Sequence, residues 1–263
     1  MTPYRLLLLL QAISLCAFGQ IEGLKLKHIG TDAGLSQTNV TCILQDDRGF
    51  MWFGTRDGLN KYDGYNFTIY KNQEDDKHSV SNNFITALLE ARNGDMWVGT
   101  WGGGVDRFDR RTRTFTLIDS AFANSFVNYI MQDSKGNIWI CTDGEGLYKI
   151  DPATGKHKCF YADTRNPSGL GDIDIYTIFE DSRHEYWVGT ANGGLYHFDG
   201  STDKFTRYSH NNSDTNSLCS NAVKAIYEDP SHHLWIGTLG GGLDRLTDRK
   251  GVFQHFFSGR STG

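Results

Sequence analysis

The chain has 263 residues, with 31 acidic and 26 basic side chains and a formal net charge of −5 at pH 7. It contains no stripe of basic residues, which argues against nucleic acid and against an anionic membrane surface as partners. The length suits one domain of the all-β kind, a class that often reaches this size.

Residues 1–19 are predicted to form an export signal. An apolar stretch opens at Leu6, and Ala17-Phe18-Gly19 fits a small-residue cleavage site. A membrane anchor is one alternative, but the apolar run is shorter than the roughly 20 residues that span a bilayer. A lipoprotein is another, suggested by Cys16, although the preceding Leu15 is bulky where a lipoprotein signal carries a small residue. We therefore expect the remainder of the chain to be exported.

A segment that starts with tryptophan recurs five times along the chain. The copy at Trp97 has the sequence WVGTWGGGVDRFD, and successive copies start 45, 42, 48 and 48 residues apart. A fixed period in this range indicates an array of supersecondary units. The five copies start at Trp52, Trp97, Trp139, Trp187 and Trp235.

Each copy predicts two strands joined by a tight turn. An apolar residue directly follows each tryptophan, as Val98 follows Trp97. Because neighbouring side chains on a strand point to opposite faces, both faces of this strand are predicted to be covered. The third position is glycine in four copies and Cys141 in the other, so a neighbouring chain can approach closely. The Gly-rich turn that follows supplies the positive φ that tight hairpins require.

Two further runs complete a four-stranded unit. An apolar-rich run, ending in acid in most copies, precedes each tryptophan, and a short aromatic run follows the hairpin. Many small sheets that are covered on both faces predict a β-propeller of four-stranded antiparallel blades. Helical repeats share this period, but β-branched and aromatic runs separated by 30 glycines argue against them. The propeller domain is predicted over residues 20–263, with blades at about 39–70, 84–118, 126–161, 174–208 and 221–257.

The two ends of the chain predict an incomplete, open ring. Residues 24–29 alternate apolar with polar side chains and predict an extra N-terminal strand. Blade five already has a fourth strand at Val252 to Phe257, so we expect the extra strand to belong to a later blade of a longer parent. An open arc of this kind would expose apolar sheet faces. A self-closed five-blade ring is the alternative.

The repeats resemble the two-component regulator propeller repeat. The resemblance rests on W-x-G-T, the Gly-rich turn, L-x-x-[FY]-D and the short F-x-x-Y strand, and it covers about residues 24–257. It implies the periplasmic sensor portion of a hybrid two-component regulator that controls polysaccharide use, with glycan fragments as ligands. It also implies a parent in the inner membrane, which would touch the membrane only through regions beyond Gly263 and would form a homodimer. The kinase of such a parent would lie there too, so we expect this chain to be non-catalytic.

Candidate ligand contacts lie in the turns between the second and third strands. These turns and the links between blades are expected to open on one face, and loops that converge there favour binding. A tryptophan beside acids, amides and arginine is a mixture that suits sugars. Several of these residues precede a glycine, so simple turn formation is the competing explanation. The candidates are Arg56, Asp57, Trp101, Asp143, Glu145 and Asn192.

No catalytic residue, metal or cofactor is predicted. His78 and His210 lie in blade links, and nothing at metal-ligand spacing accompanies either. The cysteines of the mature chain (Cys42, Cys141, Cys159 and Cys219) are expected to act as small buried hydrophobes, with a disulfide left open. The leading hypothesis is a sensory propeller that binds an oligosaccharide or another small ligand. The alternatives are a secreted scaffold for protein partners and a propeller lyase.

Overall fold

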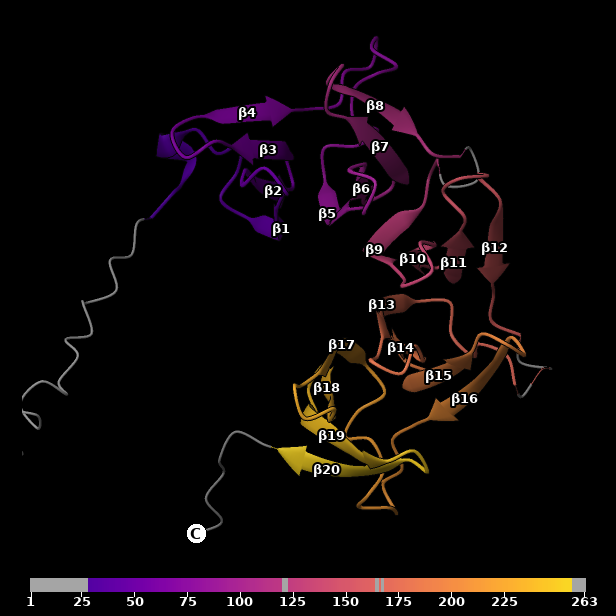
Figure 1. Ribbon diagram of the computed structural model, residues 1–263. Coiled ribbons are helices and arrows are strands. Elements are labelled where there is room, and N and C mark those ends of the chain that lie inside the picture. Colours follow the sequence, from indigo (N-terminus) through magenta and orange to yellow (C-terminus); the bar gives the residue numbers. More distant parts are fainter. Residues whose placement is uncertain (1–27, 120–122, 164–165, 167, 257–263) are drawn as a thin grey trace, which may run out of the picture.

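The computed structural model describes residues 28–119, 123–163, 166 and 168–256. Five four-stranded antiparallel sheets follow one another along the chain, each with its strands in sequence order. Figure 1 shows them arranged around an arc, with the first strand of each sheet on the inside and the fourth on the outside. The prediction of a propeller with five four-stranded blades is therefore confirmed. Among the described residues, the chain forms no helix with the length and apolarity that a membrane-crossing segment needs.

Blade 1 comprises β1 (Val40–Gln45), β2 (Met51–Thr55), β3 (Gly58–Tyr62) and β4 (Phe67–Tyr70). Blade 2 comprises β5 (Ile85–Glu90), β6 (Met96–Thr100), β7 (Val105–Asp109) and β8 (Thr114–Leu117). Blade 3 comprises β9 (Phe126–Gln132), β10 (Ile138–Asp143), β11 (Leu147–Ile150) and β12 (His157–Phe160). Blade 4 comprises β13 (Ile175–Glu180), β14 (Tyr186–Thr190), β15 (Leu195–Asp199) and β16 (Lys204–Tyr208). Blade 5 comprises β17 (Val223–Glu228), β18 (Leu234–Thr238), β19 (Gly242–Asp248) and β20 (Val252–Phe256).

The segment before blade 1 contains a short 3-10 turn, η1 (Thr31–Ala33). The predicted export signal lies outside the described residues. So does most of the predicted extra strand at residues 24–29, of which His28 and Ile29 are described and lie in irregular chain.

The hydrophobic core is divided among the contacts between neighbouring blades. Four clusters of buried side chains each combine residues from two adjacent blades. The rings of Trp52 in blade 1 and Phe108 in blade 2 form an edge-to-face pair with their centroids 5.5 Å apart, and Trp139 and Phe198 of the next blade form a similar pair at 5.7 Å. Such aromatic pairs contribute about 0.5–1.5 kcal/mol beyond the burial of their area. Each blade is therefore stabilised mainly by its neighbours, as expected for stacked repeats.

The glycine at the third position of the W-x-G-T segment makes room for the next blade. A Cβ added at Gly99 would lie 2.6 Å from Cγ1 of Val127, and one added at Gly189 would lie 2.7 Å from Cγ1 of Val223. Both valines are buried residues of the following blade's first strand. The close approach expected at this position is therefore the contact that sets the spacing between blades.

The turn between the first and second strands is fixed by an aspartate in four of the five blades. Its carboxylate accepts the indole N–H of the blade's tryptophan, as Asp133 does from Trp139 at 2.9 Å. It also accepts backbone N–H groups of the turn, such as that of Asn137 at 2.8 Å. The four pairs are Asp46–Trp52, Asp133–Trp139, Asp181–Trp187 and Asp229–Trp235.

Blades 1 and 5 lie at the two ends of the arc, and no sheet within the described part of the chain closes it (Figure 1). Leu243 of blade 5 is 39% exposed, although the corresponding leucine or valine of each other blade is fully buried at 0%. The buried counterparts are Leu59, Val105, Leu147 and Leu195. An open arc with an uncovered packing face at blade 5 agrees with the predicted incomplete ring.

Candidate functional site

The turns between second and third strands lie on the same face as the links between blades. The backbone N–H of Trp101 donates to the carbonyl of Phe84 in the link at 2.9 Å, and Ala191 donates to Asp174 in the same way at 2.9 Å. A threonine precedes each of these turns. In most blades its hydroxyl donates to the carbonyl four residues later, as Thr100 does to Gly104 at 3.0 Å, and this bond closes the turn. This combined face is called the loop face below.

Two positions in each blade form the inner rim of the loop face. In every blade the threonine near the end of the second strand pairs with a residue of the first strand. One rim position is the residue just before that first-strand partner, and the other is the residue that directly follows the threonine. From blade 1 to blade 5 these rim residues are Asn39 and Arg56, Phe84 and Trp101, Phe126 and Asp143, Asp174 and Ala191, and Ala222 and Leu239. The rim therefore changes its chemistry from blade to blade while the strands beneath it stay similar.

Three aromatic side chains of the rim form a continuous strip over blades 2 and 3, in which Trp101 and Phe126 are exposed and Phe84 is half-buried. The ring centroids of Phe84 and Trp101 are 6.0 Å apart, and those of Trp101 and Phe126 are 4.9 Å apart. Trp101 is 36% exposed and Phe126 is 41% exposed. The guanidinium of Arg56 lies over the ring of Phe84, 5.1 Å from its centroid. We call Phe84, Trp101 and Phe126 the aromatic strip.

A group of carboxylates follows the aromatic strip on the rim of blades 3 and 4. Desolvation and the neighbouring carboxylate of Asp174 raise the pKa of Asp143 above its usual range. The side chain of Asp174 accepts the N–H of Gly144 at 2.8 Å, which holds the two acids close. Lys224 lies near Asp143 and Asp174, and its Nζ lies over the ring of Tyr176, 3.0 Å from the ring centroid. This part of the rim offers hydrogen-bond acceptors together with one cation.

Three of the predicted contacts have structural partners. Asp57 forms an ion pair of 2.6 Å with Lys71. Glu145 accepts the hydroxyl of Ser125, whose carbonyl in turn receives the N–H groups of the Gly-rich turn beside Trp101. The backbone N–H of Asn192 donates to Asp172 at 2.7 Å, and the residue is exposed.

The structure therefore brings Arg56 and Trp101 together at the aromatic strip and places Asp143 at the start of the acidic group. Sequence reasoning missed Phe84, Phe126 and Asp174, which contribute as much to the rim as the residues that it found. The repeat pattern could have identified these residues, because all three occupy the same position of the repeat, at the start of the first strand or directly before it.

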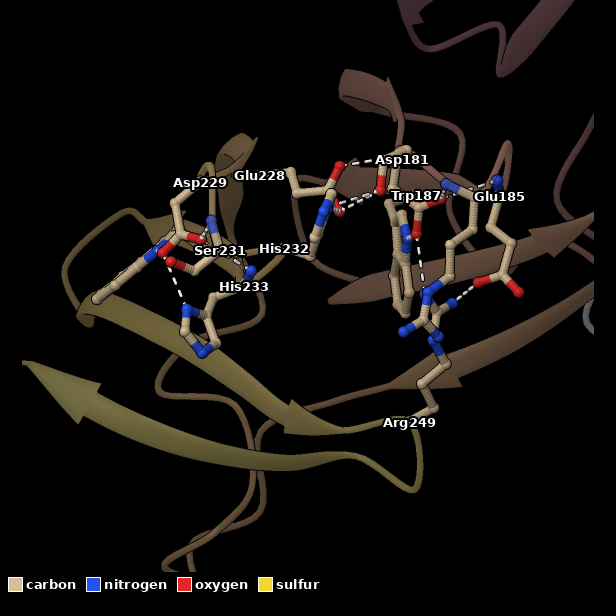
Figure 2. A network of polar contacts seen from close by, with 12 residues as sticks. Asp181, Glu185, Trp187, Glu228, Asp229, Ser231, His232, His233 and Arg249 are labelled. Carbon is tan, nitrogen blue, oxygen red and sulfur yellow. Dashed lines mark hydrogen bonds and ion pairs between the residues drawn. The ribbon is translucent and has the colours of Figure 1, made fainter.

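The opposite face of blades 4 and 5 carries a polar network that joins the two blades (Figure 2). Glu228 of blade 5 accepts the N–H and the hydroxyl of Ser182 in blade 4 at 2.7 and 2.8 Å. Arg249 donates to Asp181 at 3.0 Å, and His232 meets the Ser182 hydroxyl at 3.0 Å. Glu180 bonds Ser134 of the preceding blade in the same manner as Glu228 bonds Ser182. Because the pattern recurs between other blades, the network is explained by blade-to-blade attachment.

Comparison with known proteins identifies the repeats. The family model described as "Two component regulator propeller" matches five segments of the chain, residues 34–57, 79–102, 121–144, 169–192 and 217–240. The curated relative "Histidine kinase P4" of Formosa agariphila is 56% identical over 48 residues, which are 18% of this chain and 4% of that protein.

Solved structures support the same assignment. The extracellular domain of a putative hybrid two component system from B. thetaiotaomicron superposes with a TM-score of 0.74 at 25% identity. The match covers 87% of this chain and 31% of that chain, so the present chain corresponds to about a third of it. Virginiamycin B lyase from Staphylococcus aureus superposes with a TM-score of 0.59 at 16% identity, covering 83% of this chain and 70% of the lyase. The likeness to the lyase concerns the fold alone.

Proposed function

Because the chain is built from two-component regulator propeller repeats and belongs to that family, we propose that it is the ligand-sensing propeller portion of a periplasmic hybrid two-component regulator. We further propose that it binds a glycan fragment and does not catalyse a reaction. The observation that carries the proposal is the aromatic strip, which is exposed on the loop face between Arg56 and Asp143.

An exposed row of aromatic rings beside charged groups suits a sugar ligand. The apolar face of a pyranose ring covers a flat aromatic ring, while carboxylates and guanidinium groups at the rim bond the hydroxyls. Trp101 is 36% exposed, which is roughly 90 Å² of a side chain of about 250 Å². Covering that area contributes about 2 kcal/mol at about 25 cal/mol per Å², or roughly thirtyfold in affinity.

The rim also supports a binding role over a catalytic one. A propeller lyase would need a histidine base near the axis, with a partner that orients it. None of the ten described rim residues is a histidine. His210, in a blade link, has both ring nitrogens engaged, with the carbonyl of Leu218 at 2.6 Å and the side chain of Asn212 at 2.9 Å.

Calorimetry against a panel of oligosaccharides tests the proposal. We expect Trp101→Ala to weaken binding by about tenfold to thirtyfold, and Arg56→Ala to weaken it as well. Tyr65→Ala is the matched control, because Tyr65 is 88% exposed but lies in the β3–β4 turn at the opposite end of blade 1. Parental affinity in both Trp101→Ala and Arg56→Ala would show that the loop face was the wrong choice. Turnover of a panel sugar that disappears in His210→Ala would contradict the non-catalytic role.

A further inference from the structure

Three side chains with metal-ligating atoms meet at the outer part of blade 5. Cys219 comes from the link before β17, Asp244 from β19 and His255 from β20. Sγ of Cys219 lies 2.9 Å from Nδ1 of His255, and the same nitrogen lies 2.6 Å from Oδ1 of Asp244. The three ligating atoms all lie within 4.8 Å of one another, and Asp244 is fully buried.

Blade 2 shows which part of this arrangement is needed to attach the preceding link to the blade. In blade 2 the same positions hold Ser81, Asp106 and Leu117, and the N–H and hydroxyl of Ser81 donate to Asp106 at 2.8 and 2.5 Å. Blade 5 keeps the backbone bond, from the N–H of Cys219 to Oδ2 of Asp244 at 2.9 Å. In blade 2 a serine and an acid are enough to make this attachment, so the thiol and the imidazole of blade 5 are not needed for it.

A cysteine nucleophile activated by histidine does not fit the geometry. Such a relay uses opposite ring nitrogens, one for the thiol and one for the carboxylate. In this cluster Nδ1 of His255 faces both Cys219 and Asp244, while Nε2 lies 2.7 Å from the carbonyl of Thr215. A carbonyl only accepts, so Nε2 carries a proton. Nδ1 faces the carboxylate of Asp244 and the thiol of Cys219, and a metal ion that displaces the proton shared there would coordinate this nitrogen. Metal-bound histidines have this arrangement, with the second ring nitrogen donating to a backbone carbonyl.

We propose that Cys219, Asp244 and His255 bind a divalent metal ion of the zinc class through Sγ, Oδ1 and Nδ1. Thiolate, imidazole and carboxylate are the ligands that zinc takes in proteins, and three of them leave one position open. Ligand atoms around tetrahedral zinc are about 3.4 to 3.6 Å apart, given bond lengths of about 2.0 to 2.3 Å, so side-chain shifts below about 1 Å are enough. A hollow of about 890 Å³, lined by the preceding link, the Gly240–Gly242 turn and His255, gives an ion and a fourth ligand access to the site.

The test uses the full chain under reducing conditions, with Zn²⁺ in competition with a chromophoric chelator and Co²⁺ as a spectroscopic probe. We expect one equivalent of zinc and a thiolate-to-cobalt charge-transfer band in the parent. Cys219→Ser and His255→Leu introduce the residues that blade 2 has at these positions, so both variants should fold. The melting temperature of each variant, measured without metal, checks this. Each should lose at least about tenfold in zinc affinity, and Cys219→Ser should lose the band.

Cys159→Ser is the control for an unrelated thiol, because Cys159 occupies the position of His255 in blade 3. It should keep both the band and the affinity. The proposal is overturned by a parent that takes up no zinc, by a charge-transfer band that survives in Cys219→Ser, or by a band that only Cys159→Ser removes.

Discussion

Replacing Ala91 by aspartate should stabilise the protein, because blade 2 lacks the aspartate that the other four blades share. Ala91 is buried at that position. The indole N–H of Trp97 is buried too, and among the described residues it has no hydrogen-bond partner. In the other blades the corresponding indole donates to the aspartate at 2.8 to 3.0 Å. The introduced carboxylate would therefore find a donor already in place.

The expected gain in stability is the cost of the unpaired indole donor, which the substitution removes, less the cost of burying a carboxylate, which it adds. A buried donor without a partner costs about 1–3 kcal/mol. Asp95 lies where blade 3 has Asn137, and its negative charge will offset part of the gain. We expect a net stabilisation of about 1 kcal/mol, which raises the melting temperature by about 2 to 4 °C for a domain of this size.

A double-mutant cycle with Trp97→Phe isolates the bond. Thermal unfolding followed by circular dichroism is measured for the parent, Ala91→Asp, Trp97→Phe and the double variant. The gain from Ala91→Asp should largely disappear in the Trp97→Phe background, because the acceptor then has no indole to meet. Ala91→Asn, which has nearly the same shape but no charge, should give a smaller gain. An equal gain in both backgrounds, or a melting temperature of Ala91→Asp at or below that of the parent, would refute this account.

Two further predictions concern the spacing of blades and the response to acid. Gly99→Ala should destabilise the fold by about 1–3 kcal/mol in urea unfolding, because its Cβ would lie 2.6 Å from Val127. The matched control Gly237→Ala should change stability by less than about 0.5 kcal/mol, because its nearest contact would be at 3.4 Å; equal effects would contradict the argument. Burial acts to raise the pKa of Asp133, but hydrogen bonds, including that from Trp139, outweigh it and hold that pKa below its usual range. A depressed pKa contributes stability above about pH 4 that is lost as pH falls through the folded-state value, so Asp133→Asn should flatten the acid side of the stability profile.

The architecture could be predicted from the sequence because its cause is local. Two adjacent apolar residues in each copy, such as Trp97 and Val98, require a strand that is covered on both faces. The glycine that follows requires a close neighbour on the tryptophan face. Both conditions recur with the repeat, and the structure meets them with adjacent blades.

The site could be predicted only in part, because its contacts join residues that are distant in the chain. Trp101 was predicted as a candidate contact from its place in the turn between the second and third strands. Its neighbour Phe126 comes from the next blade, and only the packing of the two blades brings it close. The cluster in blade 5 shows the same limit. Cys219, Asp244 and His255 are 25 and 11 residues apart, and only the pairing of β19 with β20 makes the last two neighbours.

The position of the aromatic strip suggests how binding would be coupled to a change of shape. Trp101 belongs to blade 2 and Phe126 to blade 3, so a ligand that covers both rings contacts two blades at once. Beneath the strip, the hydroxyl of Thr86 bonds the carbonyl of Val127 across the same boundary at 2.5 Å. A small change in the blade 2 to blade 3 spacing would separate the rings and reduce the area that one sugar can cover. Because a ligand shifts an equilibrium only through its differential affinity for two states, contacts on both sides of a blade boundary are the ones through which ligand binding can select one blade spacing over another.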